Sequence, residues 1–258
     1  MLYWFLKWSV ARPWARLLCR ARVEGIENLP VEGPVLLAAN HLDAGETVLL
    51  PGMLARHVTF PAKAELFEGR SRKGRVLSWF LRTVGMVPMA RSGGQASASG
   101  MDSIGLVLTQ GRVLGLFPEG TRSPDGRLYK GKTGVARLAL AYGVPIVPIG
   151  MINTQLRPGP FGIPWYHSPV IRIGRPLDFS AYLGAGSNRD VLRWVTDEVM
   201  NAIMELTGQT YVDMYGVGAK QAMARGETLV ERVLPRPGHG RGTPIVPAAN
   251  PDQARGAA

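Results

Sequence analysis

A histidine with two carboxylates close behind it follows an apolar run near residue 40. The run Val35 to Ala39 is followed by Asn40 and His41, and then by Asp43 and Glu46. An imidazole ordinarily titrates near neutral pH, so a histidine at the end of a buried strand is a candidate general base. Either carboxylate can orient the ring, Glu46 only if the chain folds back after the histidine. Alternatively, His41 caps a strand and both acids are solvated.

A second apolar run ends on a turn that carries a carboxylate and a guanidinium. Residues 117–123 read Phe-Pro-Glu-Gly-Thr-Arg-Ser. The backbone N–H groups of such a turn, together with Arg122, are suited to grip a phosphate group. An ordinary polar turn with an internal ion pair between Glu119 and Arg122 is the competing interpretation. Arg91 follows another predicted strand, at the end of a basic segment, and is expected to face the same cleft.

Composition limits the classes of protein that this chain can belong to. Its 258 residues are 46% hydrophobic, which is ample for the core of one large α/β domain. A formal charge of +11 favours anionic partners such as nucleic acid, lipid headgroups or a phosphorylated substrate. The single cysteine, Cys19, excludes an intrachain disulfide and a multi-cysteine zinc site. Without zinc-ligand spacing or an RNA-binding aromatic pair, neither nucleic acid nor a metal is expected.

The N-terminus combines tryptophans and arginines in a helical pattern. The apolar stretch 1–11 is interrupted at Lys7, well short of the roughly 20 residues that a membrane-spanning helix needs. Residues 1–24 are therefore predicted to form a pair of amphipathic helices that dock on an anionic phospholipid membrane. A terminal helix packed on the domain, with solvated arginines, is the alternative. The residues expected to contact the membrane are Trp4, Trp8, Arg12, Trp14, Arg16 and Arg20.

The rest of the chain alternates between strand-like and helix-like segments. Helical periodicity is found in Thr133 to Tyr142 and in Ser187 to Leu206. The alternation predicts one α/β domain over residues 25–215, followed by a short helix and a disordered Gly/Pro/Arg-rich tail over 216–258. The predicted strands are 35–39, 58–60, 86–88, 113–117, 145–149 and 170–173.

Four segments, taken in order, resemble the sequence blocks of the glycerolipid acyltransferases. The resemblance is strongest to the bacterial 1-acyl-sn-glycerol-3-phosphate acyltransferases and covers roughly residues 25–210. One departure is that Glu46 stands where the family has Asp, and Asp43 where it often has Ser. The matching blocks are Asn40-His41 with an acid five residues after the histidine, 85–91, 117–123 and 144–150.

This resemblance implies a mixed, largely parallel sheet flanked by helices. It also implies transfer of an acyl chain from acyl-CoA or acyl carrier protein to the sn-2 hydroxyl of 1-acyl-glycerol-3-phosphate (lysophosphatidic acid). By the same resemblance, the product would be phosphatidic acid, no cofactor would take part, and the enzyme would be peripheral on the cytoplasmic face of the cell membrane. Another lyso-lipid or glycerol-3-phosphate as acceptor, or a noncatalytic lipid-binding protein, remains an alternative.

The family's residue roles transfer by position. His41 would be the base and Glu46 its partner. Asn40, Asp43 and Lys63 are further candidates for the site. The phosphate-binding residues implied by the resemblance are Arg91, Glu119, Gly120, Thr121 and Arg122.

Overall fold

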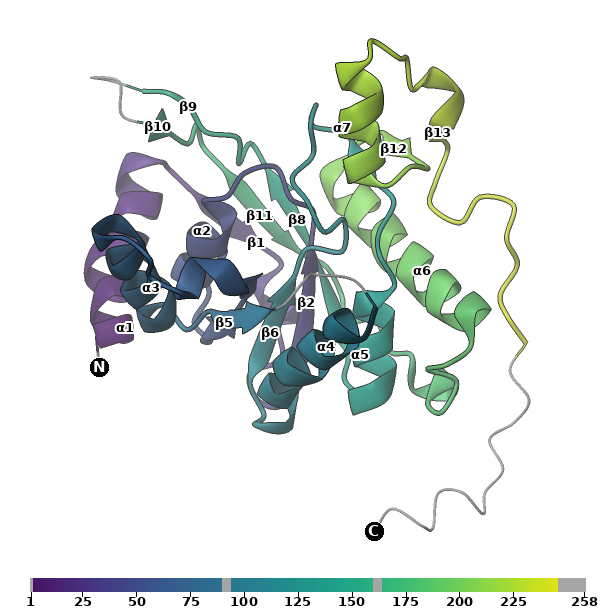
Figure 1. Ribbon diagram of the computed structural model, residues 1–258, viewed down its shortest axis with the longest axis horizontal. Helices are drawn as coiled ribbons and strands as arrows, with labels where there is room; N and C mark the ends of the chain where they lie inside the picture. The colour runs from purple at the N-terminus through teal and green to yellow at the C-terminus, as the bar shows by residue number, and fades with distance from the viewer. Residues whose placement is uncertain (1, 90–93, 160–163, 246–258) are drawn as a thin grey trace.

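A six-stranded sheet forms the centre of the molecule. The structure is a computed structural model and describes residues 2–89, 94–159 and 164–245 (Figure 1). The β8–β11 pair is antiparallel and the other four pairings are parallel. This confirms the mixed, largely parallel sheet predicted from the sequence. In sheet order the strands are β1 (Arg22–Glu24), β11 (Val170–Ile173), β8 (Ile146–Ile152), β2 (Val35–Ala39), β6 (Val113–Leu116) and β3 (Val58–Thr59).

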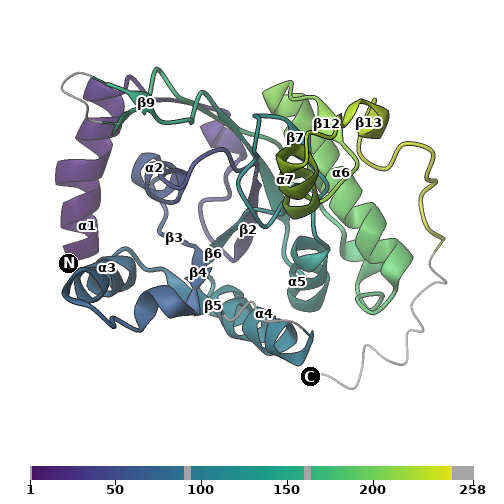
Figure 2. The same ribbon diagram turned by 45° about the horizontal axis from the view of Figure 1, so that its top comes forward.

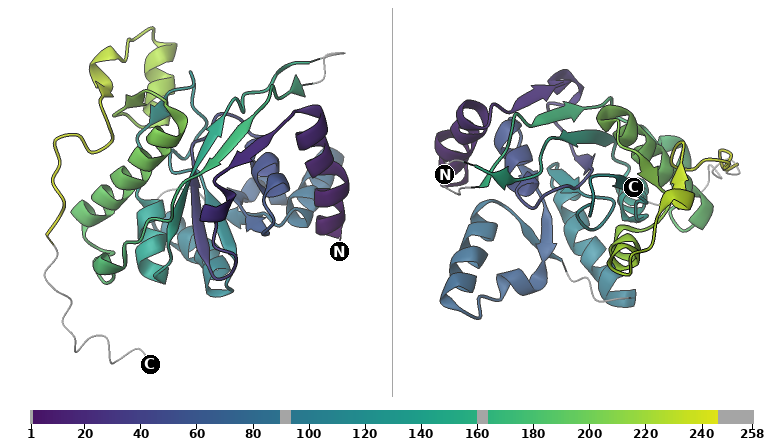
Figure 3. Two further views of the ribbon diagram at one scale, coloured as in Figure 1. Left: turned by 180° about the vertical axis from the view of Figure 1, so that it is seen from behind. Right: turned by 90° about the horizontal axis from the view of Figure 1, so that it is seen from above.

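Helices cover both faces of this sheet, which explains why the central strands are apolar throughout. In β2, Leu37 packs on one face with α2 (Glu46–Met53) and the N-terminal helix, whereas Leu36 packs on the other. Figures 2 and 3 show the two helical layers on either side of the sheet. Helix α3 (Arg72–Thr83) contributes Leu81 to the first layer. The second layer consists of α4 (Gly94–Thr109), α5 (Gly134–Tyr142) and α6 (Arg189–Thr207).

Small sheets and short helices attach to this core. A three-stranded sheet joins β7 (Leu128–Tyr129), β12 (Tyr211–Val212) and β13 (Val233–Leu234). Two ribbons pair β4 (Pro61–Lys63) with β5 (Val87–Met89) and β9 (Arg157–Pro158) with β10 (Pro164–Trp165). The remaining helices are α7 (Gly216–Ala224) and the 3₁₀ turns Ile26–Asn28, Ala64–Phe67, Ser180–Tyr182 and Val230–Arg232.

The N-terminal helix pair expected from the sequence runs as one helix from Leu2 to Leu18. It begins as α1 (Leu2–Leu6) and continues through two π-helical segments, Lys7–Ala11 and Trp14–Leu18, with helical backbone at the residues between them. Each π segment closes on a bond from a backbone N–H to the carbonyl five residues earlier. Pro13 therefore lies inside the helix and does not start a second one.

One side of this helix packs on the domain. Lys7, Ala15 and Cys19 are buried, and the Lys7 ammonium donates to the carbonyls of Ala55 (3.3 Å) and Arg56 (3.0 Å). Burial lowers the pKa of Lys7 to about 8. The lysine that interrupts the apolar run therefore attaches the N-terminal helix to the domain through hydrogen bonds.

The predicted membrane-contact residues divide accordingly. Trp14 is half-buried against the core and meets the Tyr166 ring edge-on at 5.7 Å. Trp4 and Trp8 are exposed, and the Arg12 guanidinium lies 4.3 Å from the Trp8 ring centroid. Arg16 and Arg20 are exposed as well.

Two boundaries differ from those read from the sequence. Helix α6 begins at Arg189 because the Asn188 side chain caps it. The Asn188 side-chain oxygen accepts hydrogen bonds from the backbone N–H groups of Asp190 and Val191. The predicted disordered tail is partly folded: β13 pairs with β12, and the Arg241 guanidinium lies 3.0 Å from a carboxylate oxygen of Asp197. Residues 246–258 lie outside the described part of the chain.

Candidate active site

The two motifs with candidate chemistry lie next to each other at the carboxyl ends of β2 and β6. These strands are parallel neighbours, with Ala38 opposite Leu116. The loops that follow them are joined directly, because the Ser123 backbone N–H donates to the His41 carbonyl at 2.7 Å. Functional groups of α/β domains gather at this edge of the sheet.

Glu46 orients the imidazole of His41. The distance from His41 Nδ1 to Glu46 Oε2 is 2.7 Å, and the histidine ring stacks on Phe117 at 3.9 Å between centroids, with 12° between the planes. The chain turns back through residues 43–45 so that α2 starts at Glu46 itself. A Cβ at Gly45 would collide with the Tyr166 hydroxyl, so this turn requires glycine. The ring is therefore held by the carboxylate on one edge and by an aromatic face.

The Glu46 carboxylate is fully buried and receives several donors. The Leu42 backbone N–H lies 3.2 and 3.1 Å from its two oxygens, and the Thr154 hydroxyl donates to Oε1. Burial raises the pKa of Glu46, while the bonds from His41 and Thr154 oppose that rise. These donors satisfy the carboxylate as an acceptor in a position where water is excluded.

Asp43, the other carboxylate that the sequence offered as a partner of His41, bonds within its own turn. Its Oδ1 accepts from the Gly45 backbone N–H at 2.9 Å and from the Tyr166 hydroxyl at 3.4 Å. Of the two acids, Glu46 is the one whose hydrogen bond to the imidazole ring is seen. Asp43 shapes the turn that brings Glu46 there.

Glu119 links the second loop to the first through backbone groups. One carboxylate oxygen accepts from the His41 backbone N–H at 3.1 Å, and the other from the Tyr129 backbone N–H at 2.9 Å. Burial, followed by the nearby charge of Glu46, raises the pKa of Glu119 to about 8, against the effect of these two donors. Within the described residues no ion pair joins Glu119 to Arg122, so the ordinary-turn interpretation loses its main feature.

Three cationic side chains lie around the turn at Gly120. The glycine has φ of +69°, and a Cβ there would come within 3.0 Å of the Lys132 side chain. The Lys220 ammonium, carried by α7, donates to the Thr121 hydroxyl at 2.8 Å. Arg122 is exposed, and its charge contributes, after burial, to the lowered pKa of Lys220. Together these side chains make one positively charged surface at the turn, suited to a phosphate group.

Asn40 fastens the His41 loop to the neighbouring strand β8. Its side-chain amide donates to the Met151 carbonyl at 2.9 Å, and its oxygen accepts from the Met151 backbone N–H at 2.7 Å. The amide also donates to the Gln209 side chain at 2.9 Å. Asn40 is fully buried, so its part here is to position the loop.

The other two candidates from the sequence are not brought to the cationic turn by any described contact. Arg91 lies outside the described residues. Lys63 is exposed at the end of β4, paired with Met89 of β5, the strand that leads toward residue 91. No hydrogen bond or ion pair of Lys63 is seen within the described chain.

The residues that sequence reasoning missed are Thr154, Gln209, Lys132 and Lys220. Thr154, Gln209 and Lys220 lie far along the chain from the groups they contact: 108 residues separate Thr154 from Glu46, and 99 separate Lys220 from Thr121. Only Thr154 had a usable signal, because it follows a predicted strand that ends beside β2.

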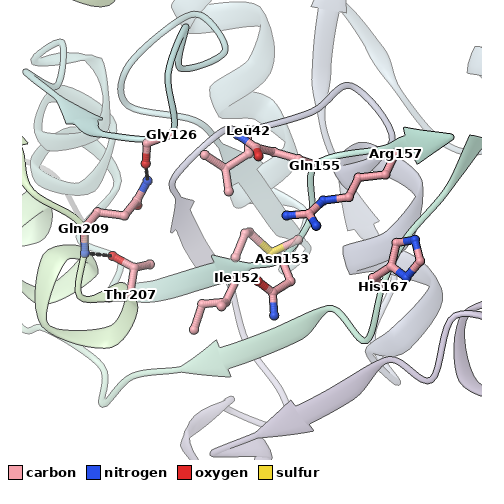
Figure 4. A pocket seen from close by; sticks show the side chains of 10 residues that line it. Leu42, Gly126, Ile152, Asn153, Gln155, Arg157, His167, Thr207 and Gln209 are labelled. Carbon is pink, nitrogen blue, oxygen red and sulfur yellow. Dashed lines mark hydrogen bonds between the residues drawn. The ribbon is translucent and has the colours of Figure 1, made fainter.

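A cavity of about 320 Å³ lies next to the His41 loop (Figure 4). Leu42, the residue after the histidine, forms part of its wall, and Figure 4 shows Arg157 reaching inward from β9. Among the residues that line the cavity, two can carry a charge, Arg157 and His167, and both are basic. The remaining polar lining comes from Asn153, Gln155, Thr207 and Gln209. Neither His41 nor the cationic turn lines this cavity. Its polar and basic lining suits a polar or anionic group.

Two further properties concern the described residues as a set. They contain no cluster of three or more His, Cys, Asp or Glu side chains that could hold a metal ion. None of their helices combines the length and the apolar character needed to cross a bilayer.

Comparisons with known proteins add a family and a fold. Residues 20–152 match the protein-family model described as Acyltransferase. The chain is 29% identical over 203 residues to 1-acyl-sn-glycerol-3-phosphate acyltransferase BAT2 of Brassica napus, covering 76% of this chain and 54% of that protein. It is 30% identical over 170 residues to lyso-ornithine lipid O-acyltransferase of Rhizobium meliloti, covering 62% of this chain and 55% of that protein. The chain spans about half the length of these curated relatives.

A solved structure shares the architecture. The crystal structure of the 1-acyl-sn-glycerophosphate (LPA) acyltransferase PlsC from Thermotoga maritima superposes with a TM-score of 0.59 over 79% of each chain. The sequence identity is 24%, so this likeness supports the fold.

Proposed function

Because the chain belongs to the acyltransferase family, we propose that it acylates the sn-2 hydroxyl of 1-acyl-glycerol-3-phosphate and forms phosphatidic acid. The observation that carries this proposal is the pairing of His41 Nδ1 with buried Glu46 at 2.7 Å, beside a turn surrounded by cations. An imidazole hydrogen-bonded to a carboxylate is suited to deprotonate a hydroxyl. The cations are suited to bind the phosphate of the acceptor.

In the proposed reaction His41 acts as the general base. Glu46 accepts a hydrogen bond from Nδ1–H, which leaves Nε2 as the basic nitrogen. As the acceptor hydroxyl attacks the thioester carbonyl carbon, Nε2 takes its proton. When the carbon–sulfur bond breaks, the thiolate leaves and the imidazolium returns that proton to it. In this scheme the ester forms without an acyl-enzyme and without a cofactor, and the proposed thioester donor is acyl-CoA or acyl carrier protein.

The acceptor phosphate is proposed to bind at the turn 119–122. Thr121 and Arg122 would contact it, with Lys220 and Lys132 adding charge, while Glu119 fixes the turn to the backbone of the His41 loop. Placing the base and the phosphate site on two joined loops would hold the acceptor hydroxyl next to the base while its phosphate is bound. Such positioning supplies much of the rate in a two-substrate reaction.

The enzyme is proposed to work as a peripheral protein on the cytoplasmic face of the cell membrane. The exposed Trp4 and Trp8, with the exposed Arg16 and Arg20, support contact with anionic phospholipid along the N-terminal helix. Deleting residues 1–22 should weaken flotation with liposomes. Undiminished flotation would contradict this location for the membrane contact.

Release of free thiol from acyl-CoA, measured with a panel of acceptors, tests the function. Lysophosphatidic acid should give the largest rate, ahead of glycerol-3-phosphate and of lyso-ornithine lipid, whose headgroup carries no phosphate. A higher rate with lyso-ornithine lipid would reassign the acceptor. No acceptor-dependent release from either acyl-CoA or acyl carrier protein would reject catalysis and favour a noncatalytic lipid-binding protein.

A further inference from the structure

Helix α3 presents large apolar side chains to solvent on the side away from the sheet. Val76 is 66% exposed and Trp79 is 55% exposed, although both belong to a helix that packs on the core through Leu81. Residues three apart in an α-helix lie on nearly the same side, so the Val76 and Trp79 side chains are about 60° apart around the helix axis. Exposing both leaves an apolar face without a partner in the described chain.

Each exposed apolar residue of α3 has a cation one helical turn before it. Arg72 precedes Val76, Arg75 precedes Trp79, and all four side chains are exposed. Lys73 stands in the same relation to Leu77, and Arg82 lies in the last turn. The helix contains no acidic residue. Cations alternating with Trp and aliphatic side chains over successive turns fit a surface that is anionic outside and apolar beneath.

The exposed side of α3 lies near the N-terminal helix. The His57 ring contacts the Tyr3 ring of that helix, with 4.1 Å between centroids. The same ring occupies the space beside Gly85, two residues after the end of α3. Figures 1 and 2 show α1 and α3 side by side at one end of the molecule. The exposed aromatic residues of both helices thus belong to one end of the protein.

We propose that the α3 face, formed by Arg72, Lys73, Arg75, Val76 and Trp79, is a second membrane-contact surface that binds anionic phospholipid. It acts beside the N-terminal helix and fixes the orientation of the domain, because two separated contacts resist the rotation that a single helix permits. This surface is independent of the reaction proposed above. An acidic protein partner would match the cations but would give no reason to expose Trp79 between them.

Two double variants on the full-length chain test the surface by flotation with vesicles. Vesicles of equal parts phosphatidylcholine and phosphatidylglycerol are compared with pure phosphatidylcholine. Arg72→Glu with Lys73→Glu should reduce partitioning onto the anionic vesicles about tenfold or more, since each basic residue near such a surface contributes roughly 1 kcal/mol. Acidic residues in the first turn suit the helix dipole, so α3 should stay folded. The matched control, Arg232→Glu with Arg236→Glu, changes the net charge equally at exposed positions elsewhere.

Val76→Glu with Trp79→Glu tests the apolar component. This pair should reduce partitioning about tenfold on anionic vesicles, because the apolar side chains no longer enter the interface. Val31→Glu with Val230→Glu, at two other exposed valines, is the control for adding two carboxylates. Partitioning equal to that of the matched controls for both α3 variants would overturn the proposal.

A dye gives a direct reading that does not depend on the strength of binding. Trp79→Cys is labelled with an environment-sensitive fluorophore, since native Cys19 is buried. The emission should shift to the blue when anionic vesicles are added, whereas the dye on Val230→Cys should not respond. No shift at position 79 under conditions where the protein floats would overturn the proposal. So would a shift that acyl carrier protein produces and vesicles do not.

Discussion

Two buried glutamates at the ends of neighbouring strands serve the same histidine in different ways. Glu46 follows β2 and bonds the imidazole ring, whereas Glu119 follows β6 and bonds the backbone N–H of the same residue. Both are almost inaccessible to water, and burial raises the pKa of both. The difference is which atoms each carboxylate touches.

This contrast separates orientation of the base from assembly of the loops. The Glu46 bond fixes the tautomer and direction of the ring, so its loss should act on turnover. Glu119 ties the His41 loop to Tyr129 and to the cationic turn, so its loss should act on stability and on the arrangement of the two loops. Substitutions ranked by their expected effect can test this division.

Replacing His41 by Ala should have the largest effect, because the proposed base disappears. General-base catalysis contributes about 10² to 10⁴ in rate, so kcat for acyl transfer to lysophosphatidic acid should fall by about that factor. Thiol release from acyl-CoA measures it, and His239→Ala, at an exposed position, serves as the control. Liposome binding should be unchanged. Turnover close to that of the unsubstituted enzyme would remove His41 from the chemistry.

Glu46→Gln should have the next largest effect. The loss of a hydrogen bond to a charged group costs about 1.5 to 3 kcal/mol, which corresponds to a fall in kcat of about 10- to 10²-fold. Asp43→Asn is the matched comparison within the same turn, and it should lower kcat much less because its contacts are with Gly45 and Tyr166. Equal losses in the two variants would show that the turn, and not the carboxylate on the ring, matters.

Lys220→Met should act on acceptor binding and leave kcat nearly unchanged. Losing one charged contact to the phosphate should raise KM for lysophosphatidic acid about tenfold. KM for a lyso-lipid without phosphate should stay the same. Arg232→Met, at an exposed position, controls for the lost charge. A rise in KM for both acceptors would assign Lys220 to the packing of α7 and not to the phosphate.

The parts of this site that the sequence could predict are those built from nearby residues. Strands β2 and β11 match their predicted bounds, and the acids near His41 lie within five residues of it. Choosing between Glu46 and Asp43 required the fold, because the choice depends on Tyr166 and Thr154, which lie more than 100 residues further along the chain. Lys220 could not be found, since only the packing of α7 brings it to Thr121.

Two helices were misread or missed for local reasons. The N-terminal segment was expected to form a pair of helices, but it runs as one helix, with π-helical hydrogen bonds on both sides of Pro13. Helix α4 begins Gly-Gln-Ala-Ser-Ala-Ser-Gly, a composition with weak helical preference, and is formed through packing of residues such as Ile104 and Leu108 against the sheet.

The smallest effect on the reaction itself is expected for Glu119→Gln, which should act on the pH dependence of stability. The folded protein raises the pKa of Glu119 from its ordinary 4.5 to about 8, so between these values the folded state holds a proton that the unfolded state has released. The free energy of unfolding should therefore fall as the pH rises through this window and become level above about 8. Gln cannot ionise, so the variant should show a flatter dependence in urea denaturation between these limits, even if the lost acceptor lowers its stability overall. Equal slopes in the two proteins would mean that Glu119 is ionised in the fold throughout, with its two backbone donors outweighing its burial.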